Sequence, residues 1–148
     1  MSRDTSLEVV IARLGAQGDG IAETDGGPLY VAHAVPGDRL RVALQHERHG
    51  RGPLRGRILE VLEPGVDRAA PACRHFGECG GCSAQQLVPD AYAAWKRALV
   101  AGPLGHRGFD AGLVEAPLPS PAGSRRRVRL AARRVGEGVV LGFNAARR

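Results

Sequence analysis

The chain has 148 residues, enough for one domain or two small ones, and a net charge of +6. Leu, Val, Ile and Phe make up about 24% of it, above the roughly 20% below which a chain is expected to be disordered. No apolar run approaches the roughly 18 residues of a membrane helix, and the charged start, MSRDTSLEVV, is unlike a signal peptide. These features argue against a membrane protein, predict a cytoplasmic one and imply no obligate protein partner.

Residues 1–64 are predicted to form a small β-domain, because apolar stretches alternate with glycine-containing turns. The expected strands are residues 7–14, 21–23, 29–32, 39–45 and 54–62. Side chains expected to point inward from the last two strands are Leu40, Val42, Leu44, Ile58 and Val61. Five short strands in one segment are typical of a closed or nearly closed OB-like barrel, which commonly binds nucleic acid on one face. The candidate RNA-binding residues of this barrel are Arg39, Arg41, Arg55 and Arg57.

The next segment, residues 65–87, contains every cysteine of the chain. The spacing is C-x5-C-x2-C, from Cys73 through Cys79 to Cys82, and thiols clustered in this way are usually metal ligands or a redox pair. Gly80 and Gly81 are expected to take positive φ angles, so that the backbone curls and turns the sulfurs toward one centre. Three thiolates leave an iron–sulfur cluster one ligand short, because such a cluster normally takes four.

Residues 88–148 are predicted to begin a second, incomplete domain with mixed α and β structure. A helix is expected over residues 89–101, and Gly102-Pro103 should end it. A β-hairpin is expected to follow, with strands at residues 128–135 and 139–143. The apolar side chains of the helix share one face, which is more typical of a protein core than of base stacking: Tyr92, Trp95 and Leu99.

Positive charge is concentrated in residues 121–148, which hold eight arginines and one acid, while the rest of the chain is close to neutral. Clustered guanidinium groups suit phosphate binding, because they make bidentate contacts and release counterions. The candidate RNA-binding residues of this segment are Arg125, Arg126, Arg127 and Arg129.

Several motifs occur in order along the chain: GDGIA at residues 18–22, AVPGD at residues 34–38, CRHFGECGGC at residues 73–82 followed by QQL and WK, and finally RRRVRL with LGF. Together they closely resemble the N-terminal part of the bacterial RNA uracil-5-methyltransferases that carry a TRAM domain. The resemblance runs from about residue 6 to residue 143, and the cysteine motif is its most specific part.

The resemblance implies a cofactor. In that family the three cysteines, with a fourth further downstream, hold a [4Fe-4S] cluster. The implied metal ligands here are Cys73, Cys79 and Cys82, and the fourth ligand would lie outside this chain. Residues 1–64 would be the TRAM barrel, residues 65–87 the cluster loop, and residues 88–148 the truncated start of the central RNA-binding domain.

The resemblance also implies an activity. In the family a thiolate attacks carbon 6 of uracil, the methyl group of S-adenosylmethionine is transferred to carbon 5, and a proton is removed. The Rossmann-like domain that does this has no counterpart in these residues, so no catalytic residue is assigned. The chain is expected to be a fragment that binds ribosomal or transfer RNA, binds no S-adenosylmethionine and is inactive by itself.

Three alternatives remain open at this stage. Cys73, Cys79 and Cys82 could bind zinc together with His75 or His106, which would make the chain a non-enzymatic RNA-interaction module. Cys79 and Cys82 could be a redox dithiol, although such a pair normally starts a helix. A radical methylthiotransferase also combines TRAM with an iron–sulfur cluster, but its cysteines are spaced C-x3-C-x2-C and its TRAM domain is at the other end.

Overall fold

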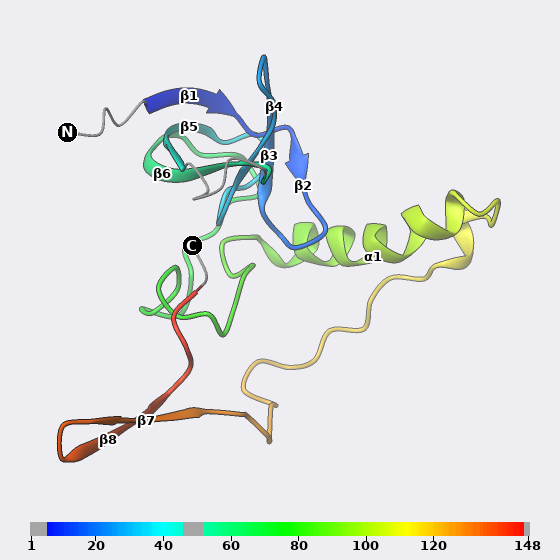
Figure 1. Ribbon diagram of the computed structural model, residues 1–148. Helices are drawn as coiled ribbons and strands as arrows, with labels where there is room; N and C mark the ends of the chain where they lie inside the picture. The colour runs from blue at the N-terminus through cyan, green and yellow to red at the C-terminus, as the bar shows by residue number, and fades with distance from the viewer. Residues whose placement is uncertain (1–5, 46–51, 147–148) are drawn as a thin grey trace.

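The structure, a computed structural model, describes residues 6–45 and 52–146. Within them, six strands form one curled sheet in the order β1-β5-β6-β4-β3-β2, and a helix and a hairpin follow (Figure 1). The sheet consists of β1 (Ser6–Val10), β2 (Arg13–Leu14), β3 (Gly20–Thr24), β4 (Gly27–Val31), β5 (Arg39–Gln45) and β6 (Leu54–Glu63). The rest consists of α1 (Pro89–Gly105), the 3-10 turn η1 (Ala111–Leu113), β7 (Ala131–Val135) and β8 (Gly138–Gly142). The predicted fold class, a small mainly β barrel with a tail, is confirmed.

The barrel curls because β1 and β2, the two halves of the strand expected at residues 7–14, pair with different neighbours. β1 is antiparallel to β5, and β2 is antiparallel to β3. Between them, Ile11 N–H donates to Asp38 O at 2.9 Å and Ala12 N–H donates to Ile21 O at 2.8 Å. The segment of Ile11 and Ala12 thus connects β1 and β2, the two end strands of the sheet, and the sheet curls into a barrel.

The core lies inside this curl, and its aliphatic side chains come from β1, β3, β4, β5 and the segments that follow β1 and β4: Val9, Ile11, Ala22, Leu29, Val31, Ala34, Leu40 and Val42. Leu44 and Ile58 pack against it from partly buried positions, as expected. The prediction for Val61 is wrong, because this side chain is 38% exposed. The ladder between β5 and β6 shifts register twice near it, so regular inward–outward alternation does not continue beyond Ile58.

A buried carboxylate joins the barrel to the cysteine loop. Asp38 is fully buried, and it accepts backbone N–H bonds from Val35 at 2.6 Å and from Gly65 at 2.8 Å. The Arg68 guanidinium donates to both carboxylate oxygens, at 2.9 and 2.5 Å, and also to His33 O at 3.0 Å. Gly65 must be glycine here, because a Cβ would lie 2.3 Å from Pro36 O. The negative charge of the Asp38 carboxylate is thus compensated by a bidentate pair with Arg68.

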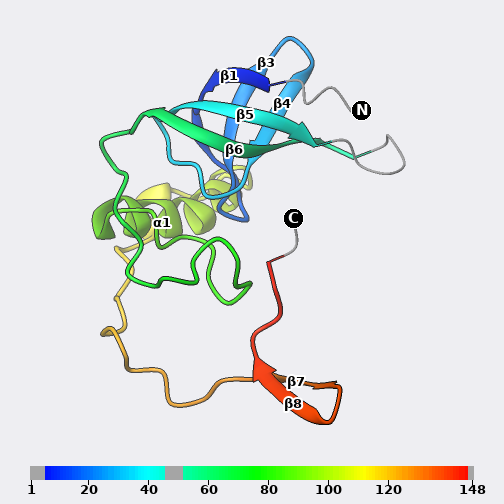
Figure 2. The ribbon, with the colours of Figure 1, turned by 90° about the vertical axis from the view of Figure 1, so that its left-hand side faces the viewer.

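Helix α1 lies beneath the barrel (Figures 1 and 2), and one aromatic side chain connects the two. Trp95 donates its indole N–H to Gly15 O at 3.0 Å, and its ring lies against Gly18. Tyr92 is 41% exposed, so the aromatic face of the helix is only partly buried, and the core position expected for this face is reached only in part.

The helix continues to Gly105 through Gly102 and Pro103, although it was predicted to end before them. Glycine before proline lacks the Cβ that would clash in a helix, and His106 N–H still bonds to Gly102 O at 3.0 Å.

The hairpin β7–β8 lies apart from the barrel in both views (Figures 1 and 2). Its strands pair from Ala131 with Gly142 to Val135 with Gly138, around the predicted turn, where Gly136 has a φ of 60°. Its apolar side chains are 59% to 67% exposed: Val135, Val139, Val140 and Leu141. Among the described residues this hairpin therefore has no core of its own.

Replacement of Asp38 by Asn should lower the free energy of unfolding by about 3–5 kcal/mol, because it leaves the Arg68 charge without its carboxylate in a largely buried position. Urea unfolding followed by circular dichroism measures the change. Glu60→Gln is a matched control, since Glu60 pairs with Arg41 at 2.6 Å on the exposed face of the sheet. That variant should unfold almost like the wild type, because exposed pairs are screened by solvent. Equal stability of the two variants would contradict the role of the buried pair.

The stability should also depend on pH through this carboxylate. Burial by itself raises the pKa of Asp38, but hydrogen bonds from Arg68, Gly65 and Val35 outweigh it and hold the pKa below its ordinary value of 3.8. The stabilisation is thus complete above pH 3.8 and is lost as the pH falls through the lower pKa of the folded state. The difference in unfolding free energy between wild type and Asp38→Asn should be constant at higher pH and shrink in acid. A constant difference throughout would argue against this assignment.

Candidate metal centre and RNA interface

The cysteine loop, residues 65–87, is closed at its base by a short antiparallel pairing. Ala69 N–H donates to Gln86 O at 2.8 Å, and Val88 N–H donates to Asp67 O at 2.9 Å. Arg68 lies in this base and bonds to Asp38, so the base is attached to the barrel. The thiols themselves lie further out along the loop.

Internal hydrogen bonds order the thiol-bearing part of the loop. Cys73 N–H donates to Gln85 Oε1 at 3.1 Å, and Cys79 N–H donates to His75 O at 2.9 Å. Gly81 N–H donates to Cys79 Sγ at 3.4 Å. All three thiols are free of disulfides; Cys79 is half-buried and the other two are exposed. The loop therefore presents reduced sulfurs near its surface.

The donor chemistry of this loop fits a thiolate-bound group, but the sulfurs are not gathered around one point. Among residues 6–45 and 52–146, no group of three or more His, Cys, Asp or Glu side chains is arranged to hold a metal ion. Two observations favour thiolate ligation: the thiols share one loop, and one sulfur already accepts an N–H, as the thiolates of iron–sulfur clusters do. Gln86, in the base of the loop, is fully buried, and its side-chain amide has no hydrogen-bond partner among the described residues.

Of the two histidines of the zinc alternative, one lies in the cysteine loop and the other follows α1. His75 is exposed, and its Nε2 accepts a hydrogen bond from Arg74 Nε at 3.1 Å. His106 is exposed at the C-terminal cap of α1. Neither belongs to a described group that could hold a metal.

Gly80 and Gly81 do not have the predicted conformation, and the close neighbours of Gly80 are what restrict that position. Neither has a positive φ angle. A Cβ on Gly80 would lie 3.0 Å from Asn144 O and 3.1 Å from Ala145 O, and a Cβ on Gly81 would lie 3.4 Å from both Cys79 Sγ and the Phe143 ring. The glycines thus allow close approach of another part of the chain.

That other part is residues 144–146, which we call the C-terminal strap. Gly80 N–H donates to Asn144 O at 2.9 Å, and Ala146 N–H donates to Glu78 O at 2.8 Å. The strap follows β8 directly, so the hairpin and the cysteine loop are joined through backbone hydrogen bonds. Nothing in the sequence pattern indicated this pairing, because the two partners lie more than 60 residues apart.

The candidate arginines fall into two groups that differ in their pairing. On the barrel, Arg39 bonds to Glu63 at 2.6 Å, and Arg41 bonds to Glu60 at 2.6 Å and to Glu8 at 3.1 Å. Arg55 pairs with Asp19 at 3.7 Å, whereas Arg57 is exposed. In the basic segment, the side chains precede β7 and are all exposed: Arg125, Arg126, Arg127 and Arg129. RNA binding by either group stays a prediction, and the acids offset much of the barrel's positive charge.

Comparison with known proteins places this chain beside RNA methyltransferases. No family model matches it. An uncharacterized RNA methyltransferase of Mesorhizobium japonicum is 42% identical over 139 residues, which are 94% of this chain and 31% of that protein. None of the helices in residues 6–45 and 52–146 has the length and apolar character needed to cross a membrane.

Two relatives have more specific names. They are the 23S rRNA (uracil(1939)-C(5))-methyltransferases RlmD of Alkalilimnicola ehrlichii and Thiobacillus denitrificans, which are 39% and 37% identical over 93% and 94% of this chain. The resemblance to RNA uracil-5-methyltransferases is therefore confirmed. This chain spans about one third of the length of these curated relatives, 31% and 33% respectively.

Replacement of Gly80 by Ala should loosen the strap, because the new methyl group would meet Asn144 O and Ala145 O at about 3 Å. Overpacking of this kind typically costs about 1–3 kcal/mol, so the Ala146 amide should exchange its hydrogen about 5-fold faster or more. Hydrogen exchange measured by NMR tests this. Gly142→Ala is the matched control, since nothing lies within 4 Å of the added Cβ. Unchanged Ala146 exchange in Gly80→Ala would contradict the pairing.

Proposed function

We propose that this chain is the RNA-binding and iron–sulfur-cluster portion of an S-adenosylmethionine-dependent uracil-5-methyltransferase acting on ribosomal or transfer RNA. The observation that carries the proposal is similarity along nearly the whole chain to proteins named RNA methyltransferases, two of which are named for carbon 5 of a 23S rRNA uracil. S-adenosylmethionine would supply the methyl group. We assign its binding and the catalytic step to the two thirds of the relatives that this chain does not match. A cytoplasmic location goes with this proposal and stays a prediction.

In this proposal Cys73, Cys79 and Cys82 supply three of the four thiolates of a [4Fe-4S] cluster. A bound cluster would connect separate points of the loop and contribute to its folding energy. The anchors of the loop support this role, because Arg68 holds its base and the strap holds it at Gly80. Only the short stretches that carry the sulfurs would have to shift for the ligands to gather.

The purified chain should take up iron and sulfide during anaerobic reconstitution, provided that a small thiol is added to occupy the fourth ligand position. The expected result is a brown protein with comparable amounts of iron and sulfide, measured by chemical analysis and visible absorbance. Cys73→Ser, Cys79→Ser and Cys82→Ser should each lose most of the bound iron, whereas the neighbouring variant Ser83→Ala should retain it. Zinc uptake without sulfide would support the zinc-binding RNA module, and absence of any metal would count against the cluster.

The exposed basic segment should carry most of the RNA affinity. Simultaneous replacement of Arg125, Arg127 and Arg129 by Ala should weaken binding about tenfold or more and reduce the slope of log affinity against log salt by about 2–3. Fluorescence anisotropy with a labelled single-stranded RNA at several salt concentrations measures both. The matched triple Lys variant keeps the charge, so its slope should stay close to that of the wild type. An unchanged slope in the Ala variant would mean that these arginines form only a solvated surface.

A further inference from the structure

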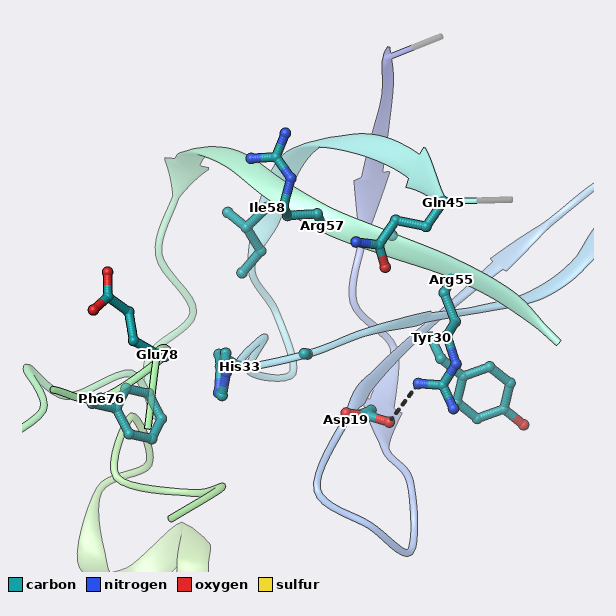
Figure 3. A pocket seen from close by; sticks show the side chains of 12 residues that line it. Asp19, Tyr30, His33, Gln45, Arg55, Arg57, Ile58, Phe76 and Glu78 are labelled. Carbon is teal, nitrogen blue, oxygen red and sulfur yellow. Dashed lines mark ion pairs between the residues drawn. The ribbon is translucent and has the colours of Figure 1, made fainter. Parts of the chain in front are cut away.

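A pocket of about 320 Å³ lies between the outer face of the barrel and the cysteine loop (Figure 3). Strands β4 and β6 and the segment after β4 form one side of it, and residues 76–78 of the loop form the other. This volume is at the lower end of the range of small-molecule pockets. The pocket is therefore of a size for one small planar group rather than for a length of folded chain.

Aromatic side chains line the pocket from both sides. His33 and Phe76 meet edge to face, with ring centroids 4.7 Å apart and an interplanar angle of 64°. Tyr30 is half-buried on β4, beside Arg55 on the neighbouring strand. Aromatic faces of this kind stack with unpaired bases regardless of sequence. The pocket thus offers surfaces on which a base can lie.

His33 also has a backbone conformation that is rare outside glycine, with a φ of 63°. The Arg68 guanidinium holds it there by donating to His33 O at 3.0 Å. Strained residues that are held in place by their surroundings occur often at binding sites. The network that joins the barrel to the loop therefore also positions an aromatic ring in the pocket.

The charges around the pocket balance and do not form a positive site. Among the described lining residues, the cations are Arg55 and Arg57 and the acids are Asp19 and Glu78, with Arg55 and Asp19 paired at 3.7 Å. A site for phosphate would be expected to carry excess positive charge. Carboxylates instead accept hydrogen bonds from the exocyclic amino groups of bases, and the amide of Gln45 offers both a donor and an acceptor.

We propose that this pocket binds one unstacked base of the RNA, and that it favours a base with an exocyclic amino group over uracil. The Phe76 ring provides a stacking surface, and Glu78 on the same loop segment accepts from the amino group (Figure 3). The arginines of the basic segment contact the phosphates elsewhere along the strand. This inference rests on the proposed RNA-binding function and adds a base-recognition site to it.

The test uses the whole 148-residue chain and short labelled oligoribonucleotides of cytidine, adenosine or uridine in an anisotropy titration. Phe76→Ala should weaken binding of all three about 5-fold or more, without changing the salt slope, because stacking and not phosphate contact is lost. Glu78→Ala should weaken binding of the cytidine and adenosine strands and leave uridine binding almost unchanged. Glu60→Ala, which removes an exposed carboxylate outside the pocket, is the matched control and should bind all three like the wild type.

Each outcome distinguishes the pocket from the wider function. If both pocket variants bind RNA as the wild type does, the proposal that the pocket binds a base is wrong, while the RNA-binding function is unaffected. An equal loss for all three strands in Glu78→Ala would overturn the preference for amino-bearing bases. Failure of the wild type to bind any RNA would overturn both proposals. Thermal unfolding of Phe76→Ala and Glu78→Ala by circular dichroism establishes that the variants are folded.

Discussion

The buried bond between Asp38 and Arg68 is the interaction on which the arrangement of the rest depends. It draws together the turn before β5, Gly65 in the turn after β6 and Arg68 in the base of the cysteine loop. A carboxylate at zero exposure is strongly destabilising unless it is paired and hydrogen-bonded. The barrel therefore reaches its observed form only with the loop base in place. Because Arg68 also bonds to His33 O, the same pair shapes the pocket between barrel and loop.

The cysteine loop is held at two points and left open between them. The barrel holds its base, and the C-terminal strap holds it at Glu78 and Gly80 through backbone bonds. Both attachments avoid the sulfurs, so the thiols keep their accessibility while the loop is confined in space. Confinement lowers the conformational entropy that a ligand would have to remove in order to bring the three sulfurs together. The strap also connects the loop with the hairpin, whose apolar side chains are mostly exposed.

The arginines of the barrel and those of the basic segment look alike in the sequence, but they differ in how far their charge is compensated. Arg39 and Arg41 have acids as cross-strand or neighbouring partners on the sheet, so their charges are largely offset. The arginines before β7 have no such ladder, because that segment is extended and outside the sheet. Long-range attraction of a polyanion depends on uncompensated charge. In the proposed function, the basic segment would therefore attract RNA, and the barrel face would contact individual groups of the bound RNA.

The sequence by itself determined the strands, the turns, the hairpin, the start of the helix and the resemblance carried by the cysteine motif. These depend on local patterns: alternation, glycine and proline at turns, and the spacing of a few residues. Tertiary structure decided what those patterns could not: the exposure of Val61, the extension of α1 through Pro103, the pairing of Asp38 with Arg68, and the approach of the strap that explains Gly80. Each of these depends on contacts between residues far apart in the chain, and such contacts exist only after the chain has folded.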